Sequence, residues 1–153
     1  MFKKPLFSLL FLVLALSASD LQITDPYVRA VPPNMPNSAA FMEIKNLTSS
    51  SIDLIQAYST AAKNVELHEH VMDGQMMKMQ QIDKITLEAQ KVTPLEPGGY
   101  HIMLLGLNQP LKEETSIVIT LHFSNAQTIN IDVPVKSIAA GMKMKQNHHG
   151  MQH

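Results

Sequence analysis

Residues 65–79 read VELHEHVMDGQMMKM. Apolar and polar residues alternate on both sides of Asp73 and Gly74, which is typical of two β-strands joined by a tight turn. An Asp-Gly pair between such runs favours a two-residue type I′ turn, because both residues tolerate a positive φ. The sequence therefore predicts a β-hairpin in which Met72 pairs with Gln75.

The predicted pairing places histidine and methionine side chains opposite one another. His68 then faces Met79, and His70 faces Met77. Strand residues two apart share a face, so all four side chains point the same way, and the Cβ atoms of each pair lie about 4.5–5.5 Å apart. Imidazole and thioether groups together suit copper(I). The other face carries apolar residues that can pack inward, namely Val65, Leu67 and Val71.

A second pair of such ligands follows on another predicted strand. His101 and Met103 come directly after the turn Pro97-Gly98-Gly99 and are two residues apart, so one strand presents both on one face. Bringing this strand beside the hairpin would complete a set of two imidazoles and two thioethers. Whether this strand lies beside the hairpin depends on the fold of the whole domain.

Short strands separated by turn residues continue along the rest of the chain. Turn signals include Pro32-Pro33-Asn34, Asn108-Gln109-Pro110 and Asn125-Ala126. Strands at this spacing predict an all-β sandwich or barrel. The predicted strands cover residues 22–30, 38–45, 51–58, 64–72, 75–81, 91–93, 99–105, 116–123 and 127–135.

Composition excludes several classes of site. The 153 residues include 11 Met and 7 His but no Cys, which rules out a thiol nucleophile, a blue-copper thiolate and a zinc-thiolate site. The formal net charge of −1 gives no basic surface for nucleic acid. No nucleophile elbow, HExxH, phosphate loop or dinucleotide motif is present, so the sequence predicts a binding protein rather than an enzyme.

The N-terminus has the layout of a secretory signal peptide. Two lysines at positions 3 and 4 precede an apolar run at 6–16, which is shorter than a membrane span. Small residues predict cleavage after Ser17 or Ser19, so we expect a periplasmic protein; an N-terminal anchor helix is the alternative. No Cys follows to carry a lipid. The predicted division is a signal peptide at 1–19, a β-domain at 20–137 and a flexible tail at 138–153.

The spacing of four of these ligands is similar to a family signature. Ten residues separate His68 from Met79, and twenty-one separate Met79 from His101. One residue then separates His101 from Met103. This H-x10-M-x21-H-x-M pattern resembles that of the PCuAC family of periplasmic copper chaperones, as do the stretches VELHE at 65–69 and LEPGGYHIML at 95–104.

The resemblance implies a cupredoxin-like Greek-key β-sandwich that takes copper, held as Cu(I) by His68, Met79, His101 and Met103. It also implies delivery of the copper to the CuA centre of cytochrome c oxidase. The expected partner is subunit II of that oxidase or another copper chaperone, and a monomer without nucleic acid or membrane anchor is expected. Copper sequestration for tolerance is the alternative function, and a copper redox enzyme is a weaker one.

Further histidines and methionines lie outside the four-residue spacing. His70 and Met77 share the predicted ligand face and are candidate secondary ligands. The tail after Ser137 is another candidate site, whose clustered imidazoles would suit Cu(II); the alternative is a tail that binds nothing. The tail ligands are Met142, Met144, His148, His149, Met151 and His153.

The remaining methionines before the tail are interpreted as packing residues, because an isolated Met on a strand usually fills the core. They are Met35, Met42, Met72 and Met76. His122 lies in an alternating strand and is expected at the surface or in a hydrogen bond.

Overall fold

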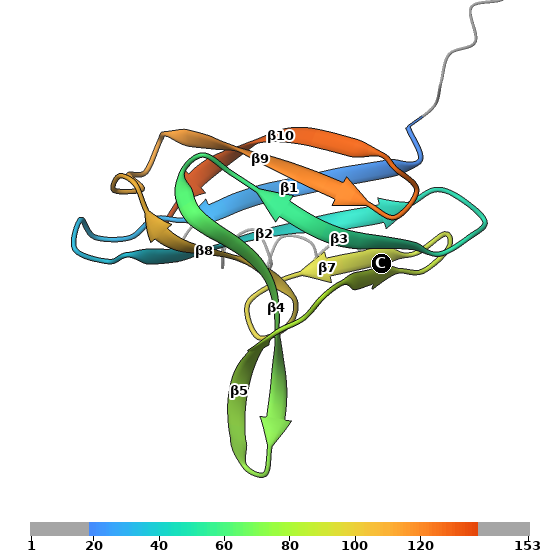
Figure 1. Cartoon of the computed structure of the whole chain (residues 1–153), viewed down its shortest axis with the longest axis horizontal. Coiled ribbons are helices and arrows are strands. Elements are labelled where there is room, and N and C mark those ends of the chain that lie inside the picture. The colour runs from blue at the N-terminus through green and yellow to red at the C-terminus, as the bar shows by residue number, and fades with distance from the viewer. Residues whose placement is uncertain (1–18, 138–153) are drawn as a thin grey trace, which may run out of the picture.

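The computed structural model describes residues 19–137, and the regular structure of this part of the chain is entirely β (Figure 1). Most of the predicted signal peptide and the whole Met/His-rich tail lie outside the described residues. Within residues 19–137, no helix is long and apolar enough to cross a membrane. The prediction of an all-β domain is confirmed.

Ten strands are present in the described residues, one more than the nine predicted. The strand that the sequence analysis missed is β6, whose three residues are too few to show an alternating pattern. The strands are β1 (Leu21–Arg29), β2 (Asn37–Asn46), β3 (Ile52–Tyr58), β4 (Ala62–Asp73), β5 (Met76–Gln81), β6 (Ile85–Leu87), β7 (Val92–Leu95), β8 (His101–Leu107), β9 (Ser116–Phe123) and β10 (Thr128–Lys136).

The strands follow one hydrogen-bonded path in the order β5-β4-β8-β2-β1-β10-β9-β3-β6, with β7 paired to β2 as a branch. Neighbouring strands are antiparallel except β1 and β10, which run parallel and connect the two layers. The path folds back, so that β3 lies against β4 and β6 lies against β2. Buried apolar side chains fill the space between the layers of this β-sandwich.

The core is built from period-two alternation of buried and exposed residues. The buried residues of β9 are every second one: Ile117, Ile119, Leu121 and Phe123. Between them, His122 bonds through Nδ1 to the hydroxyl of Thr128 at 3.1 Å, as predicted for a surface histidine. In β2, which is covered on both faces, five consecutive residues from Ser38 to Met42 are buried. The sandwich thus fixes the backbones of the strands that carry the site described below.

The β4–β5 hairpin projects from the sandwich, and its register lies two residues away from the predicted one (Figure 1). Gly74 and Gln75 form its turn, and Asp73 pairs with Met76. Of the two turn residues only Gly74 has a positive φ, of 64°, which fits a type II′ turn with glycine first. The predicted type I′ turn at Asp73 and Gly74 is therefore wrong.

The shift changes which side chains face each other but keeps them on the same face, because two residues are one full period of a strand. His70 lies opposite Met79, and Met72 lies opposite Met77. The predicted pairing of His68 with Met79, and that of His70 with Met77, are both wrong.

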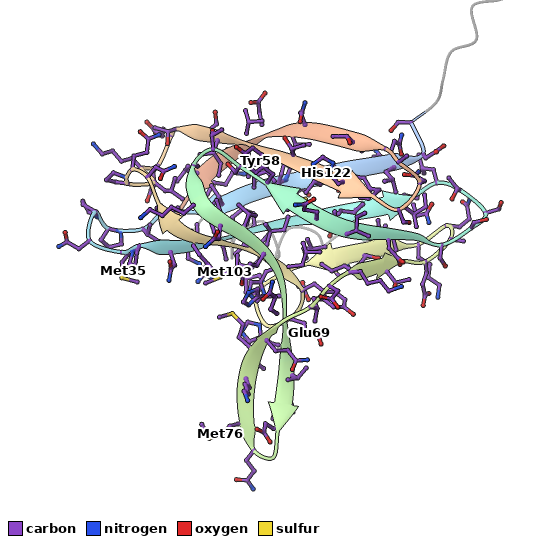
Figure 2. The ribbon with its side chains drawn as sticks, viewed as in Figure 1. Met35, Tyr58, Glu69, Met76, Met103 and His122 are labelled. Atoms are coloured by element: carbon purple, nitrogen blue, oxygen red, sulfur yellow. The ribbon has the colours of Figure 1, made fainter. Side chains whose placement is uncertain are left out.

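Three of the four methionines interpreted as packing residues are exposed. Met35, Met72 and Met76 have 52%, 62% and 75% of their surface exposed, so that interpretation is wrong for them. Met76 lies at the tip of the hairpin and Met35 in the loop after β1, both away from the core (Figure 2). Met42, in the middle of β2, is buried as predicted.

A buried asparagine holds the C-terminal end of β2. The side chain of Asn46 is fully buried, and its Nδ2 donates to the carbonyls of Ser50 at 2.8 Å and Leu87 at 2.9 Å. Its Oδ1 accepts from the backbone N–H of Thr48 at 2.9 Å and from the Thr48 hydroxyl at 2.8 Å. One amide group therefore ties β2, β6 and the loop after β2 together.

We expect Asn46→Ala to lower the free energy of unfolding by about 1–3 kcal/mol, because it leaves the buried Leu87 carbonyl without its donor. Asn108→Ala is the matched control, since the exposed Asn108 donates a single side-chain bond to the Thr60 carbonyl, and should cost under about 1 kcal/mol. Urea unfolding of the two variants measures both effects. Equal losses would contradict the role given to Asn46.

Candidate metal centre

Three strands bring the predicted ligands onto one face at the end of the sandwich. β4 pairs with β8 through its first half and with β5 through its second half, and His68 lies where the two pairings meet. The opposed pairs on this face are Glu66 with Met103, His68 with His101, and His70 with Met79. The approach of β8 to the hairpin, which the sequence left open, is therefore made through β4.

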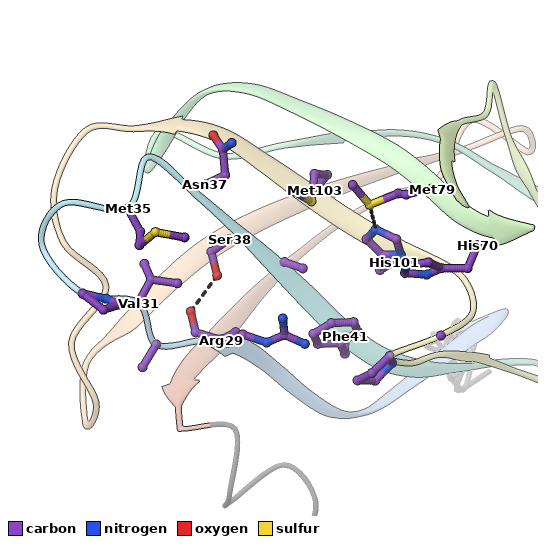
Figure 3. A pocket seen from close by; sticks show the side chains of 15 residues that line it. Arg29, Val31, Met35, Asn37, Ser38, Phe41, His70, Met79, His101 and Met103 are labelled. Carbon is purple, nitrogen blue, oxygen red and sulfur yellow. Dashed lines mark hydrogen bonds between the residues drawn. The ribbon is translucent and has the colours of Figure 1, made fainter. Parts of the chain in front are cut away.

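His101 forms the floor of the site and is 2% exposed. Its Nδ1 lies 3.1 Å from the carbonyl oxygen of Gly99, which can only accept, so Nδ1 carries the proton and donates it. In the neutral ring Nε2 then has a free lone pair, and it lies 3.0 Å from Sδ of Met79 (Figure 3). Two lone pairs with no proton between them share this volume, as the ligands of one soft cation would.

These two atoms lie in the wall of a pocket of about 680 Å³ (Figure 3). Its histidine and methionine side chains are Met35, His70, Met79, His101 and Met103. The ring of Phe41 stands 6.2 Å from that of His101, and the guanidinium of Arg29 lies 5.4 Å from the centre of the Phe41 ring. The ligand atoms therefore have apolar cover on one side and open space on the other.

His68 stands beside this pocket, with its ring centroid 5.7 Å from that of His101. Its Nε2 lies 2.7 Å from Oε2 of Glu66, and since a carboxylate can only accept, Nε2 carries the proton. Its Nδ1 is buried and has no hydrogen-bond partner among the described residues. A carboxylate behind an imidazole is the usual arrangement that orients a metal-binding histidine.

The donor set of this face favours a soft ion. In residues 19–137 no group of three or more His, Cys, Asp or Glu side chains is placed to hold a metal. Zinc, calcium and magnesium sites are built from such nitrogen, oxygen and thiolate ligands. A site at this pocket must therefore draw on the thioethers, which suit Cu(I).

Residues 21–135 match the family described as "Putative lipoprotein LpqE-like". The chain belongs to this family. A relative from Leifsonia xyli subsp. xyli, described as "Putative lipoprotein Lxx21020", is 34% identical over 134 residues, which cover 87% of this chain and 78% of the relative.

Solved structures that resemble this LpqE-like chain include PCuAC domains. The solution structure of CuI-DR1885 from Deinococcus radiodurans is 30% identical, with a TM-score of 0.61 and coverage of 82% of this chain and 83% of that one. The copper-bound PCuAC domain from PmoF2 has a TM-score of 0.68 at 22% identity, covering 78% of this chain and 94% of that domain. The resemblance to the PCuAC family and the cupredoxin-like β-sandwich are both confirmed.

The LpqE-like fold brings three of the four predicted main ligands into one pocket, namely Met79, His101 and Met103. His68 lies next to them in the sheet, directly opposite His101. His70, predicted as a secondary ligand, lines the same pocket, and its ring lies 5.0 Å from that of His101.

The other secondary candidates are Met77 and the residues of the tail. Met77 is opposite Met72 toward the hairpin tip, and the tail residues fall outside the described part of the chain: Met142, Met144, His148, His149, Met151 and His153.

The sequence analysis gave no place in the site to Glu66 or Gly99. Glu66 could have been found, because a residue two before His68 shares its face. The Gly99 contact is made by a backbone carbonyl, which every residue has, so the residue type at this position does not reveal it.

Burial is the main cause that lowers the pKa of His101 below the ordinary histidine value of about 6.5. The hydrogen bond to Gly99 acts in the opposite direction. Positive charge on His70, on His68 or on Arg29 adds to the lowering. The ring is therefore neutral near pH 7, which is the form that a metal ion needs.

The same shift predicts how the metal-free LpqE-like domain responds to acid. Because the pKa of His101 is lower in the folded state, the unfolded state binds more protons as the pH falls below about 6.5, and the free energy of unfolding decreases. We expect a shallower decrease in His101→Leu, which has no group to titrate there. Denaturant unfolding at pH 7.5 and pH 5.0, with a copper chelator present, measures the free energy of unfolding of both proteins. An equal decrease between the two pH values in the unmodified chain and in His101→Leu would contradict the prediction.

Proposed function

We propose that this chain is an exported copper chaperone that holds Cu(I) at the pocket described above. The observation that carries the proposal is the convergence of Nε2 of His101 and Sδ of Met79, which lie 3.0 Å apart. Thioether sulfur and neutral imidazole are donors that favour Cu(I) over hard cations. The copper ion is the cargo of the protein rather than a resident cofactor.

The proposed ligands are His68, Met79, His101 and Met103. His101 would bind through Nε2 and His68 through Nδ1, because the other nitrogen of each ring is engaged by a backbone carbonyl or by Glu66. The buried Nδ1 of His68, which has no partner among the described residues, supports this assignment. His70 is the nearest reserve ligand, since it lines the same pocket.

The relatives support both the cargo and the export. The PmoF2 domain is described as copper-bound and DR1885 as its CuI form, and the descriptions of the family and of its Leifsonia member both begin "Putative lipoprotein". The signal-peptide pattern at 1–19 supports a periplasmic location. There a thioether has the advantage that it does not form the disulfides that would consume a thiolate.

We propose further that the copper passes to the CuA centre of cytochrome c oxidase, through subunit II directly or through another copper chaperone. None of the four proposed ligands is anionic, and Met79 is 42% exposed. An acceptor with stronger ligands can therefore displace the thioethers one at a time. The copper stays as Cu(I) throughout, so the transfer needs no electron donor.

We expect Met79→Leu combined with Met103→Leu to weaken Cu(I) binding by at least about 100-fold, because changes in the outer shell of metal sites alone cost 10–100-fold. Leucine keeps the volume of methionine but removes the sulfur. Competition with a chromophoric Cu(I) chelator measures the affinity. Met76→Leu is the control, since Met76 is exposed on the other face of the hairpin, and it should bind as the unmodified chain does. Unchanged affinity in the double variant would overturn the proposed site.

Delivery is tested in a strain that lacks this chain. We expect reduced cytochrome c oxidase activity at low copper, recovery on adding copper, and complementation by the unmodified chain but not by the Met79→Leu, Met103→Leu variant. Copper sensitivity is measured in parallel. Raised sensitivity with normal oxidase activity would refute delivery and favour sequestration.

A further inference from the structure

The outer half of the β4–β5 hairpin carries methionines that packing does not explain. All six residues of β5 are exposed, so burial does not hold this strand in place. Met72 is 62% exposed and Met77 is 59% exposed. A large apolar side chain that stays in water gains nothing from the hydrophobic effect, so a grouped set of them points to another use.

The register places these two sulfur-bearing side chains together. Met72 and Met77 are directly opposed, and they share the face of the next opposed pair, His70 and Met79. The Cβ atoms of an opposed pair lie about 4.5–5.5 Å apart, and successive pairs on one face are about 7 Å apart along the strands. Met76 pairs with Asp73 and therefore points to the opposite face.

We propose that Met72 and Met77 form a second, outer binding site for a soft monovalent ion, Cu(I), one step outside the pocket. Two thioethers are neutral and soft, so they hold Cu(I) weakly and do not retain Zn²⁺, Mg²⁺ or Ca²⁺. The outer site exchanges its ion with Met79, the next thioether on the same face. In each exchange one sulfur–copper bond forms as another breaks, and copper remains Cu(I).

The transfer role of the outer site rests on the proposed function, whereas the existence of the site does not. Weak binding is what its position requires, because an ion held firmly at the hairpin tip would not move on to the pocket. Exposure of both side chains lets an ion arrive from solvent or from a partner protein without any opening of the sandwich.

The existence of the site is tested with Ag(I), an air-stable soft ion, and the methyl NMR signals of the methionines in the full chain. Beyond one equivalent of Ag(I), we expect the Met72 and Met77 methyl signals to shift and the Met76 signal to stay. Loss of the Met77 shift in Met72→Leu and of the Met72 shift in Met77→Leu, with both shifts kept in Met76→Leu, confirms the pair as the ligand set. An equal response of Met76, or no response of Met72 and Met77, would overturn the proposal.

Transfer is tested by stopped-flow loading of Cu(I) from a soluble Cu(I) complex. We expect the Met72→Leu, Met77→Leu variant to load several-fold more slowly than the unmodified chain, and Met76→Leu to load at the unmodified rate. An unchanged rate in the double variant would remove the transfer role. Ag(I) shifts at Met72 and Met77 without any shift at Met79 would keep the outer site while refuting the inner one, so the two failures are distinguishable.

Discussion

The pairing of one strand, β4, with two partners is the constraint on which the site depends. Its first half is held in the sandwich by β8, and its second half leaves the sandwich and pairs with β5. His68 sits at the change of partner and so faces His101 on one side. The histidines and the methionine of β4 all have even residue numbers, so their side chains point to the same face of the strand. On that face Met103 lies on the inner side, toward the sandwich, and Met79 lies on the outer side.

Burial of His101 gives the site its chemical character. A histidine with 2% exposure is costly to charge, so the folded chain favours the neutral ring, and its free nitrogen faces Sδ of Met79 at 3.0 Å. The Gly99 carbonyl decides which nitrogen that is. The same burial that keeps this ring neutral links the folding stability of the domain to pH. A soft ion bound to the lone pair would stabilise the folded state, and less so in acid, where protons compete for the nitrogen.

Alternation along the strands was enough to predict nine of the ten strands in residues 19–137, the all-β class, and the face on which the predicted ligands of these residues lie. It was not enough for the register, because Asp73-Gly74 and Gly74-Gln75 both make acceptable two-residue turns. The choice of the second turn moved the partner of Met79 from His68 to His70. Exposure of Met72 was missed for a related reason, since periodicity reports the face of a residue and not whether the sandwich extends far enough to cover it.

The order of ligands along the hairpin face suggests a direction for the ion. A pair of thioethers at Met72 and Met77 lies outermost, a mixed imidazole and thioether pair follows, and the buried nitrogen of His101 lies innermost. Imidazole nitrogen is the stronger donor, and desolvation at the floor strengthens each interaction with a cation. An ion that enters at the tip thus meets progressively better ligands. Under the proposed function, release by the same path would follow contact between these exposed side chains and an acceptor with stronger ligands.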